Sequence, residues 1–179
     1  MIWLLTGASH TGKTALARRI LVARPRLSLS LDLLKMGCIR GGLTALTPED
    51  DDALAAFLWP VVRGVMRTAL ENGQDLLIEG GYIPEDWEED FTADERRFIR
   101  YGGLVMTETY IRTHWADILA HGCDAERRKD PSWTMADALA DNAQHEAACL
   151  RRGLPILYIR EDWEQDTARW PQVFPDGAV

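Results

Sequence analysis

Short apolar runs alternate along this chain with longer segments in which apolar residues recur every three or four positions. The short runs predict five β-strands, at Ile2–Leu5, Leu27–Leu31, Asp75–Ile78, Gly103–Met106 and Pro155–Ile159, the fourth with an alternative start near Phe98. Strands that alternate with helical segments are typical of a parallel sheet covered by helices. In such sheets, ligands bind at the carboxyl ends of the strands.

The longer segments predict helices over residues 15–23, 48–73, 108–120 and 134–152. The first would bury one face that carries Leu16, Ala17, Ile20 and Leu21. Thr47 is expected to cap the second helix, with Pro48 in its first turn, and Pro60 is expected to kink or split it. Gly153 should close the last helix, and the tail from Asp162, with Trp163 and Trp170, should pack against the body.

A glycine-rich motif lies between the first strand and the first helix. It fits G-x-x-x-x-G-K-[ST] and consists of Gly7, Ala8, Ser9, His10, Thr11, Gly12, Lys13 and Thr14. Strand, glycine loop and helix form the context of a phosphate-binding loop, in which backbone N–H groups and the helix dipole hold an anion. Lys13 would reach the outer phosphates, and the Thr14 hydroxyl would bind magnesium. A chance glycine turn is the alternative.

Composition and charge narrow the range of partners. With 179 residues, of which 46% are hydrophobic and 27% charged, the chain is expected to form one domain, residues 1–179. A net charge of −8 argues against nucleic-acid binding. The longest apolar runs are too short to span a membrane.

Three cysteines without a C-x-x-C pair suggest reduced thiols in a cytoplasmic protein. The spacing of His114, His121 and Cys123 matches no common zinc pattern. Oligomeric state is left open.

Glu79 ends the third strand and is followed by Gly80, Gly81 and Tyr82. A carboxylate directly after an apolar strand beside a phosphate-binding loop is typical of a magnesium-binding residue. Gly80 would let a substrate approach the backbone, and Tyr82 is expected to contact that substrate. The alternative for Glu79 is an ordinary strand-end carboxylate.

Elimination favours a small phosphotransferase. The guanine-reading motif N-K-x-D is absent, and the chain is short for a motor or transporter ATPase. With the motif at residues 7–14 and this order of elements, the chain resembles the P-loop kinase family of nucleoside monophosphate, shikimate and gluconate kinases and antibiotic phosphotransferases. The resemblance implies a three-layer α/β P-loop NTPase fold with a five-stranded parallel sheet and a short lid. It also implies that ATP and Mg²⁺ are used.

The resemblance further implies an acceptor pocket at the end of the second strand. In family members that phosphorylate an alcohol, an aspartate at this place takes the hydroxyl proton, and Asp32 follows the second strand here. An N-cap for the residues after it is the alternative role for Asp32. Lys35 and Arg40 are candidates for binding an anionic acceptor, and Arg40, beside two glycines, is the better one. The acceptor-side insertion would span about residues 33–73.

Arginines gather where the family places its lid, here about residues 121–133. By resemblance, Arg127 and Arg128 would neutralise charge on the transferred group, and Arg112 would contact ATP. A solvated charged loop is the alternative for this segment.

These features predict a magnesium- and ATP-dependent kinase that phosphorylates a small hydroxylated metabolite in the cytoplasm. One alternative is a nucleoside monophosphate kinase, although the residues after Glu79 lack the arginine with which such kinases grip a nucleotide phosphate. The other alternative is a regulatory module that binds ATP without transferring phosphate. The identity of the acceptor is not encoded in any motif of this sequence.

Overall fold

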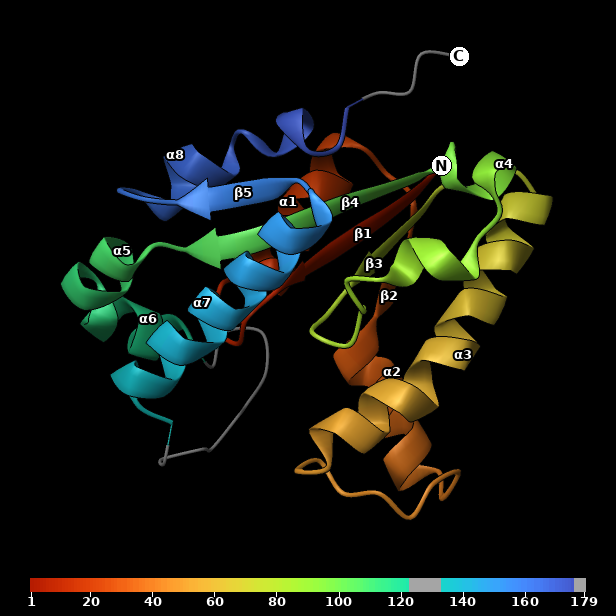
Figure 1. Cartoon of the computed structure of the whole chain (residues 1–179), viewed down its shortest axis with the longest axis horizontal. Helices are drawn as coiled ribbons and strands as arrows, with labels where there is room; N and C mark the ends of the chain where they lie inside the picture. Colours follow the sequence, from red (N-terminus) through yellow and green to blue (C-terminus); the bar gives the residue numbers. More distant parts are fainter. Residues whose placement is uncertain (123–132, 176–179) are drawn as a thin grey trace.

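Five parallel strands form the central sheet of the molecule (Figure 1). The computed structural model describes residues 1–122 and 133–175. The strands are β1 (Ile2–Gly7), β2 (Leu27–Ser30), β3 (Leu76–Glu79), β4 (Ile99–Met106) and β5 (Ile156–Ile159). Their order in the sheet is β2-β3-β1-β4-β5, and every neighbouring pair is parallel. The predicted five-stranded parallel sheet is therefore confirmed.

The sheet is buried on both faces because helices pack on each of them. Successive side chains of a strand point to opposite faces, so one strand can contribute to the core on both sides. In the central strand β1, Trp3 and Leu5 belong to one buried cluster, and Ile2 and Leu4 belong to another. The first cluster includes residues of helix α1 (Lys13–Ala23), and the second includes residues of helix α3 (Asp51–Glu71). The result is the predicted three-layer α/β fold.

The other described helices are α2 (Leu31–Arg40), η1 (Trp87–Asp90), α4 (Ala93–Arg96), α5 (Glu108–Thr113), α6 (Trp115–His121), α7 (Met135–Arg152), α8 (Trp163–Thr167) and η2 (Trp170–Gln172). Of these, α7 packs against β4 and the rest are shorter than α1. Helix α7 ends as predicted, with Gly153 closing it in the left-handed conformation at φ 65°. It starts one residue later than predicted, because Thr134 lies outside the helix and forms a capping box with Asp137. Helix α1 buries Leu16, Ala17 and Ile20 as predicted.

One prediction about the second helix is wrong, and of the kink or split expected at Pro60 only the split is excluded. Thr47 does not cap α3, because its amide and hydroxyl both donate to the Asp50 carboxylate, at 2.7 and 2.8 Å, and hold a separate turn before the helix starts. Pro60 does not split α3, which is continuous from Asp51 to Glu71. Pro60 has no backbone N–H, so the carbonyl of Ala56 loses its hydrogen-bond donor within the helix. Both residues are exposed, and water can donate to that carbonyl instead.

The single helix predicted over residues 108–120 is instead two helices, α5 and α6, separated at His114. His114 leaves the helical conformation at φ −113°, and its ring stacks on that of Tyr110, with the ring centroids 4.3 Å apart. The break lets α6 run in a new direction along the carboxyl edge of the sheet.

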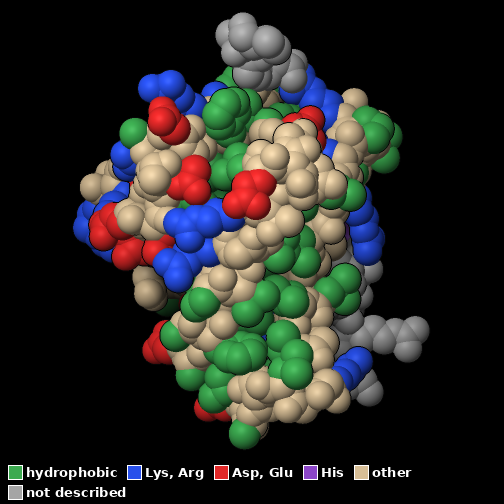
Figure 2. Space-filling view, turned by 90° about the vertical axis from the view of Figure 1, so that its right-hand side faces the viewer, with side chains coloured by type: hydrophobic (Ala, Val, Ile, Leu, Met, Phe, Trp, Pro, Cys, Tyr) green, Lys and Arg blue, Asp and Glu red, His purple; other side chains and the backbone are tan. Residues whose placement is uncertain are grey.

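Helix α3 is the one described helix that is long and apolar enough, by length and composition alone, to cross a membrane. Its residues Leu54, Leu58, Val62 and Met66 are fully buried in this structure. Figure 2 shows the face that carries this helix, with most charged side chains in the upper half and hydrophobic ones in the lower half. Core contacts account for part of the apolar character of α3, since 33% of its apolar stretch is buried while Val61 and Val65 are exposed.

Candidate functional site

The loop between β1 and α1 wraps around a concave space at the carboxyl edge of the sheet. His10 and Gly12 both have left-handed backbone conformations, at φ 61° and 86°. A side chain at position 12 would also collide with Trp163, since a Cβ atom there would lie 2.6 Å from its Nε1 atom. Glycine is therefore required at position 12 for two independent reasons.

Side chains of the loop bond to the loop itself. The Thr11 hydroxyl and the Lys13 ammonium both donate to the carbonyl of Ala8, at 2.9 and 2.8 Å. The indole N–H of Trp163, on α8, donates to the carbonyl of Thr11 at 3.0 Å. These contacts hold the loop in shape, which is the preorganisation that binding of an anion by backbone N–H groups requires.

The two residues predicted to bind magnesium lie together. Thr14 lies in the first turn of α1, and its hydroxyl donates to the Glu79 carboxylate at 3.2 Å. Glu79 is paired across the sheet with Leu5 of β1 and is only 2% exposed. No lysine or arginine in the part of the chain that the structure describes forms an ion pair with this buried carboxylate. A hydroxyl next to a buried carboxylate without a basic partner is a donor set that fits Mg²⁺.

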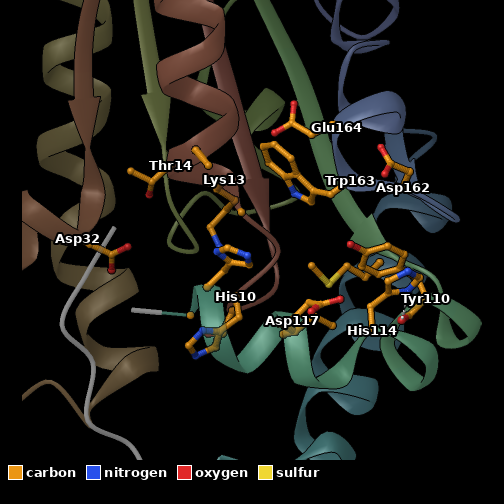
Figure 3. Close-up of a pocket in the computed structure, with 17 residues that line it drawn as sticks. His10, Lys13, Thr14, Asp32, Tyr110, His114, Asp117, Asp162, Trp163 and Glu164 are labelled. Carbon is orange, nitrogen blue, oxygen red and sulfur yellow. Dashed lines mark hydrogen bonds between the residues drawn. The ribbon is translucent and has the colours of Figure 1, made fainter. Parts of the chain in front are cut away.

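Asp32 lies across the cavity from the loop. It occupies the first turn of α2, whose N-cap is Ser30, so the alternative of Asp32 as the N-cap is wrong. The helix starts at Leu31, two residues before Leu33, where an N-cap at Asp32 would place its start. The Asp32 side chain is 14% exposed and lies 3.5 Å from the ammonium of Lys35. It is thus a nearly buried carboxylate that faces the same space as Lys13 and Thr14 (Figure 3).

A cavity of about 560 Å³ joins these groups. Ser9, His10, Gly12, Lys13 and Thr14 form one wall, and Asp32 forms part of another. The far end is lined by residues that the sequence did not predict for the site, namely Tyr110, His114, Asp117, Ile118, His121, Asp162, Trp163 and Glu164. The volume is in the range of small-molecule sites.

The far end of the cavity is aromatic and acidic. Figure 3 shows Tyr110, His114 and Asp117 on one side and Trp163 with its neighbours on α8 above them. Burial, together with the carboxylates of Asp162 and Asp117, raises the pKa of Tyr110. Its hydroxyl therefore stays protonated at neutral pH and is available as a hydrogen-bond donor.

The expectation that the tail packs against the body is confirmed for both of its tryptophans. Trp170 is buried, with its ring centroid 5.7 Å from that of Trp3. Trp163 also touches the glycine loop and lines the cavity. The sequence signal that could have placed Trp163 in the cavity is its position just after the fifth strand. The carboxyl ends of all parallel strands meet at one edge of the sheet, where ligands bind.

Other predicted site residues are not brought into this cavity. Arg40, Gly80 and Tyr82 do not line it, and Arg40 is exposed at the far end of α2. Arg112 also lies outside it and pairs with Glu108 on its own helix at 2.9 Å. Arg127 and Arg128, and most of the expected lid at 121–133, lie outside the described residues. The roles of these residues stay predictions.

Comparisons with known proteins agree on the fold. No protein-family model matches the chain, and no curated protein matches it in sequence. Among solved structures, it is similar to a sugar kinase from Janibacter sp. HTCC2649, with a TM-score of 0.53, 16% identity and coverage of 97% of this chain and 93% of that chain. It is also similar to a shikimate kinase from Bacteroides thetaiotaomicron, with a TM-score of 0.54, 14% identity and 97% and 98% coverage. A third is the shikimate kinase from Aquifex aeolicus vf5, with a TM-score of 0.55, 10% identity and 97% and 96% coverage.

These similarities extend over almost the whole chain and show that it has the fold of the P-loop kinases. At such low identity they establish the fold alone. The activity has to be argued from the site.

Proposed function

We propose that this protein is a kinase that transfers the γ-phosphoryl group of Mg-ATP to a hydroxyl group of a small metabolite. The single observation that supports this best is that one cavity is lined by the phosphate-binding loop with Lys13 and Thr14 and, across from them, by the Asp32 carboxylate. Glu79 does not line the cavity, and it is joined to it by the hydrogen bond from the Thr14 hydroxyl. A protein that only senses ATP has no use for a carboxylate opposite the phosphates.

The chain's own groups account for each requirement of phosphoryl transfer. The loop N–H groups and Lys13 would hold the β- and γ-phosphates, and the aromatic far end with Trp163 would take the nucleoside. Thr14 and Glu79 would hold Mg²⁺, which neutralises charge on the phosphates. Asp32 would orient the acceptor hydroxyl and accept its proton as the oxygen bonds to the γ-phosphorus and the bond to the β–γ bridging oxygen breaks. ADP is then the leaving group.

Substrate class and cellular location are part of the same proposal. The solved structures with this fold include kinases named for a sugar and for shikimate, which supports a hydroxylated metabolite as acceptor. Cys38 and Cys149 are buried free thiols, which supports a reducing compartment such as the cytoplasm.

The test is a screen for ADP release that depends on an added acceptor. Monosaccharides, sugar acids, shikimate, aminoglycosides, nucleosides and nucleoside monophosphates would each be added with Mg-ATP, and Lys13→Ala would serve as the inactive control. We expect stimulation by at least one alcohol. Stimulation by nucleoside monophosphates alone would assign a nucleotide kinase, and ATP binding with no stimulation would assign a regulatory module.

A further inference from the structure

A buried lysine lies directly behind the proposed base. Lys35 is 7% exposed and follows Asp32 by one helical turn on α2. Its ammonium is 3.5 Å from the Asp32 carboxylate and donates to the hydroxyl of Tyr82 at 2.9 Å. That hydroxyl in turn donates to the carboxylate of Asp51, the first residue of α3, at 2.7 Å.

The direction of these hydrogen bonds is fixed by chemistry. An ammonium has only protons to give, and an ionised carboxylate can only accept. The Tyr82 hydroxyl therefore gives its proton to Asp51 and turns a lone pair toward Lys35. The Tyr82 ring adds a second contact, since the ammonium lies 5.1 Å from the ring centroid.

Burying an ammonium is costly unless it is paired and hydrogen-bonded, so Lys35 needs these partners. They come from three separate parts of the chain: α2, the loop that follows β3, and the start of α3. Tyr82 is also three residues beyond Glu79. The network thus ties the helix that carries Asp32 to the strand end that carries the proposed magnesium ligand.

Lys35 is in the wrong place to bind the acceptor itself. Asp32 lines the cavity, whereas Lys35 and Tyr82 do not. The ammonium donates to the Tyr82 hydroxyl and pairs with the Asp32 carboxylate. The expectation that Lys35 binds an anionic acceptor is therefore not supported by its contacts.

We propose that Lys35 is a positioning residue that holds the Asp32 carboxylate toward the cavity, and that the Tyr82–Asp51 pair holds Lys35. This inference rests on the proposed function, because it requires Asp32 to act as the base. It assigns Tyr82 a structural contact to Lys35 in place of the predicted contact to substrate.

A double-mutant cycle between Lys35 and Asp32 tests the inference. The variants are Lys35→Met, Asp32→Asn and the two combined, with Tyr82→Phe as a milder change that removes only the hydroxyl. Arg151→Gln, an exposed arginine on α7, is the control for loss of one positive charge. The measured quantity is the single-turnover rate of Mg-ATP hydrolysis with enzyme in excess, so that water is the acceptor and no metabolite has to be known.

We expect Lys35→Met to slow hydrolysis about 10- to 100-fold and Tyr82→Phe to slow it less, within the range of energies that couple contacting residues. In the Asp32→Asn background, Lys35→Met should cause no further loss, because its effect passes through that carboxylate. The rise in melting temperature that Mg-ATP produces should be the same in all of these variants and in the Arg151→Gln control.

Several results would overturn the inference. These are an unchanged rate in Lys35→Met, an equal loss in the wild-type and Asp32→Asn backgrounds, or a loss of the Mg-ATP effect on melting. A full rate in Asp32→Asn, or wild-type hydrolysis no faster than that of Lys13→Ala, would instead remove the base role of Asp32 on which the inference rests. Acceptor-dependent ADP release would still report on the proposed function separately.

Discussion

The phosphate-binding side and the acceptor side of the cavity are built in different ways. On the phosphate side, Lys13 bonds to Ala8, only five residues away, and the shape of the loop follows from the local chain. On the acceptor side, Lys35 bonds to Tyr82, 47 residues away, and Tyr82 bonds to Asp51, 31 residues away. A short motif can specify the first kind of site, whereas the second exists only after distant segments have packed together.

The difference also concerns charge. The phosphate side presents a lysine and backbone N–H groups to the cavity, and the acceptor side presents a carboxylate whose partner, Lys35, does not line the cavity. If the proposed function is right, changes on the acceptor side should affect transfer and leave ATP binding intact. Changes on the phosphate side should affect both.

The largest expected effect is on the acceptor side. Asp32→Asn should lower phosphoryl transfer to the best acceptor of the screen by about two to four powers of ten, the usual contribution of a general base. The amide keeps the size of the carboxylate, so the fold should be retained. Steady-state rates measure the loss, and an unchanged Mg-ATP effect on the melting temperature is the control. Near-native transfer in this variant would show that Asp32 is not the base, and a nucleoside monophosphate as best acceptor would then favour the nucleotide kinase.

Lys13→Ala should lower transfer by about 100- to 1,000-fold, as expected when one preorganised charge at the reacting group is removed. Unlike Asp32→Asn, it should also weaken ATP binding, which a titration followed by melting temperature would detect. In the structure the Lys13 ammonium bonds to the Ala8 carbonyl of its own loop. The Lys13→Ala variant should therefore remain folded in the absence of ATP. Full activity in Lys13→Ala would contradict the assignment of the loop.

A third prediction concerns His145, which lies on α7 next to Gly103 of β4. The pKa of its ring reports the positive charge of Lys13 on the phosphate side of the cavity. Burial, with a smaller effect from the charge of Lys13, lowers the pKa of His145 from 6.5 to about 4. In the unfolded chain this histidine takes up its proton at higher pH than in the folded protein. Its stabilising contribution is therefore complete above about pH 6.5 and is lost as the pH falls toward about 4, by at most about 3 kcal/mol.

Denaturant unfolding between pH 4 and pH 7 measures this loss, and His145→Gln should flatten the profile. NMR titration of the His145 ring in Lys13→Ala should show a higher pKa than in the wild type, because one positive charge has gone. An unchanged slope in His145→Gln would assign the pH dependence to other groups. An unchanged His145 pKa in Lys13→Ala would show that the charge of Lys13 does not act on His145.

The smallest expected effect concerns the contact between α8 and the loop. Trp163→Phe removes the hydrogen bond to the Thr11 carbonyl, which is typically worth about 1 kcal/mol, or about a fivefold loss of ATP affinity. Trp170→Phe is the matched control, since it changes a buried tryptophan away from the loop and should lower stability without changing ATP affinity. Equal ATP affinities in Trp163→Phe and the wild type would mean that the loop keeps its shape without this bond.

Much of the architecture follows from the sequence alone. The five strands and the glycine that closes α7 were predicted, because strand periodicity and a closing glycine act within a few residues. The sequence of residues 7–14 likewise predicts a loop between strand and helix. The conformation of this loop depends on which of its positions are glycine. The arrangement of Thr14 with Glu79 was also predictable, because both lie at the ends of elements that meet at one edge of the sheet.

Only the tertiary structure decided where the chain departs from its local preferences. Thr47 resembles a helix cap, but the Asp50 carboxylate holds it in a separate turn, and His114 breaks a helix that periodicity would continue. Trp163 reaches the loop at Thr11 across 152 residues, and Lys35 bonds to Tyr82 and does not line the cavity. The Thr47 turn and the break at His114 are held by contacts only three and four residues away, and these local contacts outweigh helix propensities of a fraction of a kcal/mol. The positions of Trp163 and Lys35 depend on contacts across the fold, which no local pattern encodes.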